Sequence, residues 1–172
     1  MIAITAILII AFAGGPTKLE SAASFEHQGW AAWQGGRLAE AKEKFEQAVK
    51  LDPKLVNAWN GLGWAQFNAG DTDAGEKAFR KALELEPNFP AALNGVGQID
   101  LGRRQYAKAE QELLKAAPSA PAAWAGLARL YLLQGKFAEA QKWAQKLVDS
   151  PDGKQYEPLL AAAKAGKLDD KL

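Results

Sequence analysis

A 34-residue pattern recurs along the chain and constrains its fold more than any other feature of the sequence. Its clearest copy covers residues 56–89, where small and aromatic residues recur at helical spacing on both sides of Gly70-Asp71, and Pro87 stands near the end. Such spacing indicates helix faces that pack on a neighbour. One copy therefore predicts two helices joined by a tight turn, and repetition at this period is typical of a stacked helical array.

Four columns of residues share this register, with successive spacings of 34, 34 and 31 residues in each. Two helices can cross closely only where side chains are small, so the columns rich in Gly and Ala predict helix crossings. We therefore predict an all-α fold of four helix-turn-helix units. In chain order the columns are Phe25, Trp59, Leu93 and Trp124; Gly29, Gly63, Gly97 and Ala128; Ala41, Gly75, Ala109 and Ala140; and Ala48, Ala82, Ala116 and Leu147.

At these positions the chain resembles the tetratricopeptide repeat (TPR) family, whose pattern runs Trp, Leu-Gly, aromatic, Ala, Phe, Ala and Pro. The resemblance covers residues 22–151 and implies a right-handed α-solenoid. The second unit carries the pattern as Trp59, Leu62-Gly63, Phe67, Phe79, Ala82 and Pro87, with Gly75 where the family usually has Ala.

The third unit departs from the family pattern. Leu113 replaces the aromatic residue, and Pro118 arrives three residues early, so we expect the second helix of this unit to be short by nearly one turn. We expect Trp59 and Trp124 to lie between the paired helices of the second and fourth units, and replacing Trp59 by Ala to cost about 3–5 kcal/mol, as for a buried large aromatic residue.

The pattern also sets the boundaries within the chain. We predict an apolar segment at 1–15, a linker at 16–21, units at 22–55, 56–89, 90–120 and 121–151, and a capping helix with its tail at 152–172. Terminal units need a polar outer face, so the lysines of the last segment suit a cap, with Leu159 and Leu160 facing the fourth unit. The expected helices are 21–34, 38–51, 56–69, 73–85, 90–101, 105–116, 121–134, 137–149 and about 155–165.

Residues 2–13 are almost wholly apolar. The stretch is short for a membrane-spanning helix, which needs about 20 apolar residues. It suits the apolar region of a secretory signal, and Ala11-Phe12-Ala13 resembles a signal-peptidase site, although the usual preceding basic residues are missing. A removed signal, a membrane anchor and a segment that packs on protein all remain open. The segment predicts an exported (periplasmic or extracellular) or membrane-associated protein.

Composition and motifs argue against several classes of function. The chain has 21 basic and 20 acidic residues, which is unlike the basic footprint of a nucleic-acid-binding protein or a polybasic membrane patch. It has no cysteine, and its single histidine, His27, has no companion ligands. Asp71-Thr72-Asp73 lacks the later Gly and Glu of a calcium loop and is better interpreted as a helix cap. We predict no catalytic site, no cofactor and no metal.

The family resemblance implies a concave groove that holds peptides, lined by the first helix of each unit at its ninth and twelfth places. Each such pair is three residues apart and shares a helix face. The aromatic members are either core between helices or an apolar binding surface. With Asn60, the candidate partner-binding residues are Trp30, Trp33, Asn60, Trp64, Phe67, Gln98, Leu101, Arg129 and Leu132.

Gly61, Gly95 and Gly126 form a further column at the sixth place. Each costs a helix about 1 kcal/mol relative to Ala, so we expect something to approach closely there, either a ligand or a neighbouring helix. Some family members hold a C-terminal carboxylate with basic residues in the groove. Those basic residues are mostly missing here, which argues against such a clamp.

The sequence therefore favours a non-catalytic interaction module that binds an extended or helical apolar segment of a protein or peptide partner. The alternative is a structural protein that self-assembles, with the apolar N-terminus of one copy docking on another. An enzyme is the third and least favoured class. We expect an apolar ligand against the first two units, any acidic end towards Arg129, no nucleic acid, and membrane contact only through residues 1–15.

Overall fold

The computed structural model describes residues 17–151 and 153–167, and within them it is all helical. Apart from the starts of α1 and α9, the bounds differ from the predicted ones by at most one residue. The elements are α1 (Lys18–Gln34), α2 (Leu38–Leu51), α3 (Val56–Asn68), α4 (Thr72–Leu85), α5 (Pro90–Gly102), α6 (Tyr106–Ala116), α7 (Ala122–Leu133), α8 (Phe137–Val148), the 3-10 helix η1 (Gly153–Tyr156) and α9 (Glu157–Ala165).

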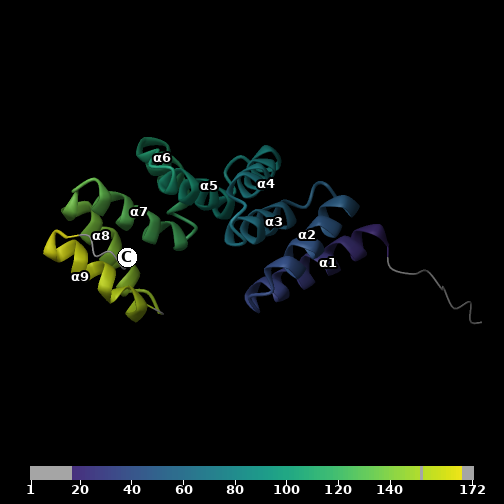
Figure 1. Ribbon diagram of the computed structural model, residues 1–172, viewed down its shortest axis with the longest axis horizontal. Coiled ribbons are helices and arrows are strands. Elements are labelled where there is room, and N and C mark those ends of the chain that lie inside the picture. Colours follow the sequence, from purple (N-terminus) through teal and green to yellow (C-terminus); the bar gives the residue numbers. More distant parts are fainter. Residues whose placement is uncertain (1–16, 152, 168–172) are drawn as a thin grey trace, which may run out of the picture.

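The helices pair as four hairpins that stack into an arch, whose two ends bend towards the same side (Figure 1). Each odd-numbered helix from α1 to α7 contacts the next odd-numbered one, whereas among the described residues no two even-numbered helices touch. The even-numbered helices are therefore spread apart on the outside of the curve. The inside is formed by α1, α3, α5 and α7, as the family resemblance implied.

In each of the first three units, a bulky side chain from the second helix packs that unit against the next. The ring of Phe79 on α4 lies so close to Gly63 and Gly95 that a methyl group added to either glycine would come within 2.5 Å of it. The close approach predicted at the glycine column is therefore made by a neighbouring unit. Phe45 lies in the same way between Gly29 and Gly61, and Leu113 between Gly97 and Gly126.

The turns inside the units use the left-handed backbone conformation. Gly36, Gly70 and Gly135 have φ values of 72°, 90° and 71°, and the equivalent turn of the third unit has Arg104, at 59°. Arg104 is the one described residue other than glycine with a positive φ. A side chain in this conformation costs roughly 1–2 kcal/mol, so the third turn carries strain that the others avoid.

Several expectations about individual elements can be compared with the structure. Asp71 caps α4, since its carboxylate accepts a hydrogen bond from the Ala74 backbone N–H at 3.1 Å. The second helix of the third unit, α6, has 11 residues against 14 in α2 and α4, which confirms the predicted shortening. The predicted linker at 16–21 is wrong over its last four residues, because α1 begins at Lys18.

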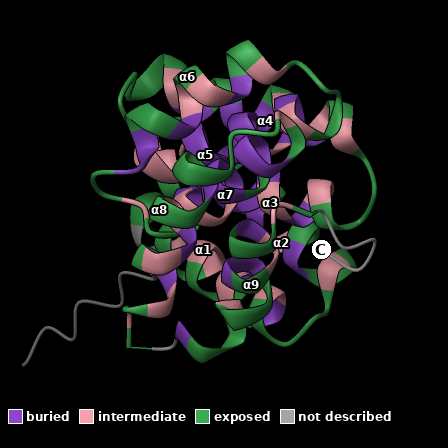
Figure 2. Ribbon diagram, turned by 90° about the vertical axis from the view of Figure 1, so that its left-hand side faces the viewer, coloured by how far each residue is buried: buried purple, intermediate pink, exposed green. Residues whose placement is uncertain are grey.

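The C-terminal end of the array is closed by α9. Leu159 and Leu160 are buried together with Leu127, Leu130 and Leu147 of the fourth unit, which confirms the predicted cap. The helix is shorter than expected, because a 3-10 turn replaces its first residues. Figure 2 views the molecule from this C-terminal end. Buried residues lie on the inward faces of the helices, and exposed residues lie on the outer faces and in the loops.

Trp59 and Trp124 differ from the prediction, because both are only half-buried. Their indole N–H groups donate to main-chain carbonyls of the preceding inter-unit loops, Trp59 to Pro53 at 2.9 Å and Trp124 to Ala117 at 2.8 Å. Each tryptophan therefore ties its helix to the loop that enters the unit. This polar contact keeps the ring at the edge of the core instead of inside it.

Within the described ranges, no helix combines the length and the apolar character that crossing a bilayer requires. The apolar segment 1–15, with its alternatives of signal, anchor and packing segment, lies outside the described residues.

Candidate functional site

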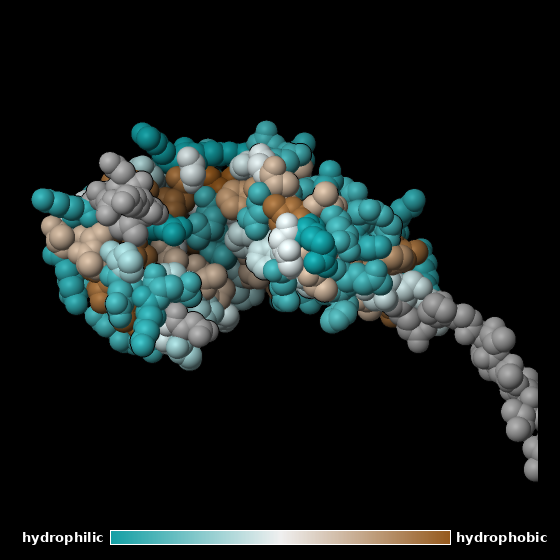
Figure 3. Space-filling model, turned by 60° about the horizontal axis from the view of Figure 1, so that its bottom comes forward, coloured by the Kyte–Doolittle hydropathy of each residue, from teal (hydrophilic) through white to brown (hydrophobic). Residues whose placement is uncertain are grey.

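The concave side carries a hollow of about 360 Å³, here called the main hollow. Its wall combines residues of α1, α3 and α5 with Ala122 at the start of α7 and Ala120 in the preceding loop, and it contains no charged side chain. The view onto the underside of the arch shows the surface hollowed between the two ends (Figure 3). The main hollow is lined by Trp30, Trp33, Asn60, Trp64, Asn68, Ala91, Asn94, Ala120 and Ala122.

Trp30 and Trp64 occupy equivalent places in the first two units, 34 residues apart. Each ring meets the inter-unit phenylalanine edge to face: Trp30 meets Phe45 and Trp64 meets Phe79, both with ring centroids 5.1 Å apart. Both tryptophans remain partly exposed and line the main hollow. The sequence left core packing and a binding surface as alternatives, and in the structure the same rings pack on core phenylalanines and also line the main hollow.

Buried polar groups accompany these rings. Asn60 and Asn94 are only 3% and 4% exposed, respectively, although both line the main hollow. The Asn94 side-chain oxygen accepts a hydrogen bond from the Gln98 amide at 3.3 Å. The Asn60 side-chain oxygen and the Trp33 indole nitrogen are buried and have no partner. A buried polar atom without a partner costs about 1–3 kcal/mol, so this region is incompletely satisfied in the free chain.

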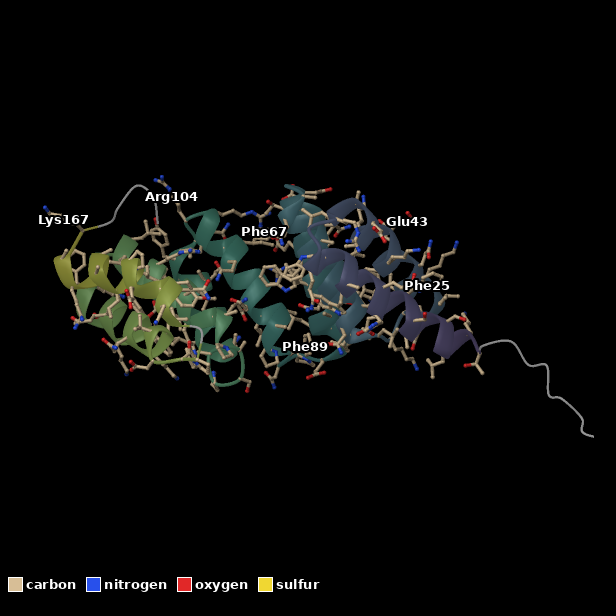
Figure 4. All side chains as sticks on the ribbon, turned by 90° about the horizontal axis from the view of Figure 1, so that it is seen from below. Phe25, Glu43, Phe67, Phe89, Arg104 and Lys167 are labelled. Carbon is tan, nitrogen blue, oxygen red and sulfur yellow. The ribbon has the colours of Figure 1, made fainter. Side chains whose placement is uncertain are left out.

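The structure divides the predicted groove residues among three surroundings. Trp30, Trp33, Asn60 and Trp64 meet in the main hollow. Phe67 and Gln98 line a second hollow of about 380 Å³, together with Thr72, Asp73, Ile99, Gly102 and Arg103. Figure 4, which views the array from below, shows Phe67 and Phe89 at opposite edges of its middle section.

The three remaining predicted residues lie outside both hollows. Leu132 is 4% exposed and belongs to the buried cluster that α9 completes. Leu101 is partly buried against the same cluster, and Arg129 is exposed on α7. The fourth unit thus differs from the first two, because the C-terminal cap draws its apolar residues into the core.

Some residues of the main hollow were missed from the sequence. Asn94 could have been found, because it stands 34 residues after Asn60 in the same register. Ala91, Ala120 and Ala122 carry no chemical signal. They reach the main hollow only through the packing of the third and fourth units against the first two.

A cluster of charged side chains joins units two and three beside the second hollow. Arg103, which follows α5, binds Asp73 at 2.5 Å and also pairs with Glu76, and both acidic residues belong to α4. Burial alone would raise the pKa of Glu76, but hydrogen bonds from Arg103 and Arg80 hold it below its ordinary value. Burial, with the charge of Glu76, raises the pKa of the neighbouring Asp100 carboxyl. The charges of this cluster are explained by the ion pairs of Arg103 with Asp73 and Glu76, which join unit three to unit two.

Metal-binding chemistry finds no support in the described part of the chain, where no three His, Cys, Asp or Glu residues gather as a ligand set. His27 is exposed on α1. Near the main hollow, burial raises the pKa of the Glu26 carboxyl, and a hydrogen bond from the Trp30 side chain acts in the opposite direction. The lining of the main hollow itself consists of apolar rings, alanines and neutral amides.

Stacked helical hairpins with a concave inner surface define an α-solenoid of the repeat type. The family model described as "Tetratricopeptide repeat" matches residues 27–92, 60–117 and 95–154, and the chain belongs to this family. Such domains are commonly protein-interaction modules. Among curated proteins, none matches the chain significantly.

Solved structures of other repeat proteins share the fold. PilW, a type IV pilus biogenesis factor, superposes with a TM-score of 0.75 at 22% identity over 84% of this chain and 69% of its own. Pseudomonas aeruginosa PilF gives a TM-score of 0.70 at 21% identity, covering 86% of this chain and 78% of its own. A thermophilic TPR protein of Thermus thermophilus gives 0.71 at 19% identity, over 84% and 81%. These likenesses concern the fold alone.

Proposed function

We propose that this chain is a non-catalytic protein-interaction module whose main hollow binds an uncharged, apolar peptide segment. The observation that carries the proposal is the lining, in which Trp30, Trp33 and Trp64 surround a concave surface without any charged side chain. Concave apolar surfaces with a few polar groups are typical binding sites. Aromatic anchors also supply much of the energy at protein interfaces.

The absence of charged side chains from the lining of the main hollow favours a neutral ligand. A bound carboxylate or ammonium group would lose its water without meeting an opposite charge, which is strongly unfavourable in an apolar site. Arg129, the exposed basic residue of α7, remains the proposed neighbour of any acidic end that extends beyond the main hollow.

Self-assembly is the second candidate function. Residues 2–13 contain no charged side chain and are rich in Ile, so their chemistry matches the lining of the main hollow. In this version the N-terminal segment of one copy occupies the main hollow of another. Export or membrane association, proposed from the same segment, would compete with this use by removing or sequestering it.

Peptide binding to the full chain tests the first proposal. The probe is an acetylated and amidated peptide of residues 2–13 with two lysines added at each end for solubility. Its control replaces every Ile and Leu by Ser. Calorimetry should detect binding of the apolar probe and no binding of the control. If neither peptide binds, the proposal is contradicted.

A substitution that fills the main hollow tests the site more sharply than truncation of Trp64. Truncating Trp64 would also disturb the core, because its ring packs on Phe79. Ala122→Phe adds bulk at the exposed edge of the main hollow and removes no core contact. Ala107→Phe, on the exposed face of α6, is the matched control. Only the first variant should lose the peptide, and equal binding by both would remove the main hollow as the site.

Sedimentation separates the two candidate functions. If residues 2–13 serve self-assembly, the mass of the full chain rises with concentration, and a chain that starts at Thr17 stays monomeric with an unchanged helical spectrum. Ala122→Phe should then also dissociate the full chain. A concentration-independent mass leaves the binding of a separate partner as the function.

A further inference from the structure

A second depression, here called the outer hollow, lies on the other side of the second unit and has a volume of about 290 Å³. Its α3 residues follow one another at spacings of three and four, on the side of the helix turned away from Asn60 and Trp64 of the main hollow. Its other residues belong to α4, one of the helices on the outside of the arch. The outer hollow is lined by Trp59, Leu62, Gln66, Ala74, Lys77, Ala78 and Lys81.

The outer hollow combines apolar side chains with two ammonium groups. Trp59 is half-buried and Leu62 is buried, whereas Lys77 and Lys81 are exposed one turn apart on α4. Lys77 forms no ion pair within the described ranges, and neither Asp nor Glu is among the lining residues. Lys81 binds Glu84 at 2.6 Å, but exposed pairs of this kind contribute little, so another carboxylate can replace Glu84.

The aromatic column to which Trp59 belongs shows what covers this place in other units. In the first unit the Lys44 ammonium lies 5.5 Å from the centre of the Phe25 ring. In the fourth unit the Lys146 ammonium lies 4.1 Å from the Trp124 ring. Both rings are therefore covered by a lysine of their own unit, an arrangement that cation–π attraction favours.

The second unit lacks this cover. Ala78 stands at the place of Lys44, and Lys81, at the place of Lys146, binds an acidic side chain of its own helix. Among the described residues no ammonium group lies over the Trp59 ring. The ring is thus left as part of an open depression whose rim carries positive charge.

We propose that the outer hollow binds an acidic segment of a partner protein, which places an aliphatic or aromatic side chain against Trp59 and carboxylates beside Lys77 and Lys81. Complementarity of charge identifies the partner, because both charged groups of the lining are ammonium groups. A free anion would leave the apolar part of the lining uncovered, and a wholly apolar ligand would leave the lysines unmatched. A segment that carries both kinds of group satisfies the whole lining.

This interaction goes beyond the proposed function, because it uses the opposite side of α3. The main hollow takes a neutral apolar segment, whereas the outer hollow takes an acidic one. Since the two surfaces share no lining residue, one chain can hold both partners at the same time.

The probe is the peptide acetyl-Asp-Asp-Leu-Phe-Asp-Asp-amide. One control peptide replaces Leu-Phe by Ser-Ser, and another replaces every Asp by Lys. The full chain is labelled with ¹⁵N at its indole nitrogens, and the six tryptophan signals are assigned with single Trp→Phe variants. The probe should move the Trp59 signal and leave those of Trp30, Trp33 and Trp64 in place. Because charge contributes, its affinity should fall as salt is added.

Two charge reversals at equivalent places test the role of the rim. Lys77→Glu removes an attraction and adds a repulsion, so it should weaken binding of the probe roughly five-fold, as expected for exposed charges. Lys142→Glu makes the same change of charge in the fourth unit, where Lys146 covers the ring, and should leave binding unchanged. Equal weakening by both variants would mean that the probe responds to the charge of the whole protein, and it would overturn the site.

A filled outer hollow gives a second test. The equivalents of Ala74 in the other units are Glu40, Lys108 and Glu139, so this place accepts a long side chain. Ala74→Phe should therefore keep the helical spectrum and abolish binding of the probe, whereas Ala107→Phe on the exposed face of α6 should change neither. Full binding by Ala74→Phe rejects the outer hollow as the site.

The outcomes for the two proposals are separable. The apolar peptide of residues 2–13 and the acidic probe are both measured on Ala74→Phe and on Ala122→Phe, and each variant should lose only one of the two ligands. No movement of the Trp59 signal at millimolar probe, or equal binding of either control peptide, rejects the outer hollow and leaves the proposed function standing. Failure of the apolar peptide alone rejects the proposed function and leaves the outer hollow.

Discussion

The ring of Phe79 packs against the main chain of Gly95 in the following unit, where a methyl group would lie 2.5 Å from the ring. We predict that Gly95→Ala lowers the free energy of unfolding by about 1–3 kcal/mol, the usual cost of overpacking a core. Because this contact couples units two and three, the transition in urea should also broaden. Equilibrium urea denaturation followed by circular dichroism measures both effects.

Gly102 is the matched control for this prediction. It belongs to the same helix, and apart from its own chain neighbours and helix backbone no atom lies within 4 Å of where its methyl group would be. Gly102→Ala should leave stability unchanged or raise it by up to about 1 kcal/mol, because Ala restricts the unfolded chain. Similar destabilisation by both variants would show that the loss comes from helix α5 as a whole and not from Phe79.

Trp59 should contribute less to stability than a fully buried tryptophan. Trp59→Phe keeps most of the ring and removes the hydrogen bond to Pro53, so it should cost about 0.5–1.5 kcal/mol. Trp59→Ala should cost about 2–3 kcal/mol, below the range of about 3–5 kcal/mol for a large buried aromatic. Thermal melts of both variants test this, and a loss of about 5 kcal/mol or more on the same scale would contradict the half-buried position.

Arg104 offers a stabilising substitution. Its φ of 59° is the conformation that Gly36, Gly70 and Gly135 adopt in the other turns. Arg104→Gly should raise the free energy of unfolding by about 1 kcal/mol, because relief of left-handed strain outweighs the added freedom of the unfolded chain. Chemical denaturation checks the sign. The neighbouring Arg103→Gly should instead destabilise, since Arg103 binds Asp73 and Glu76.

The repeat made most of the fold predictable. Four columns in one register define where helices must cross, and Asp71 and Pro118 mark a cap and a shortened unit that the structure confirms. The strained turn at Arg104 was also within reach of the sequence, because it occupies the column of Gly36 and Gly70. Periodicity succeeds here because each unit meets only its neighbours in the array.

The site was less predictable, because periodicity assigns a residue to a helix face and not to a degree of exposure. Trp64 shows this, since one ring both packs on Phe79 and lines the main hollow. Leu132 holds in the fourth unit the place that the partly exposed Phe67 holds in the second, but it is buried. The contribution of Ala122 depends on how the shortened third unit places α7, and no local pattern encodes that.

The environment of Tyr131 leads us to predict that the free energy of unfolding falls at alkaline pH. Its hydroxyl donates to the Glu110 carboxylate at 2.7 Å, and burial, with this bond and the charges of Glu110 and Glu139, raises the pKa of Tyr131 to about 12. An ordinary tyrosine ionises near pH 10, so between about pH 10 and 12 the folded chain holds a proton that the unfolded chain has released. Stability from this group is therefore complete below about pH 10 and is lost as the pH rises towards about 12.

Tyr131→Phe isolates this effect from other groups that titrate at high pH. At about pH 9 the variant should be less stable than the parent by about 1 kcal/mol, the net value of the lost hydrogen bond. From about pH 9 to about pH 11.5 the parent should lose about 2 kcal/mol more than the variant, the energy of a pKa shift of this order. Urea denaturation of both proteins at each pH measures the difference. A constant difference would mean that the hydroxyl ionises equally easily in the folded and unfolded chains, and that Glu110 does not hold its proton.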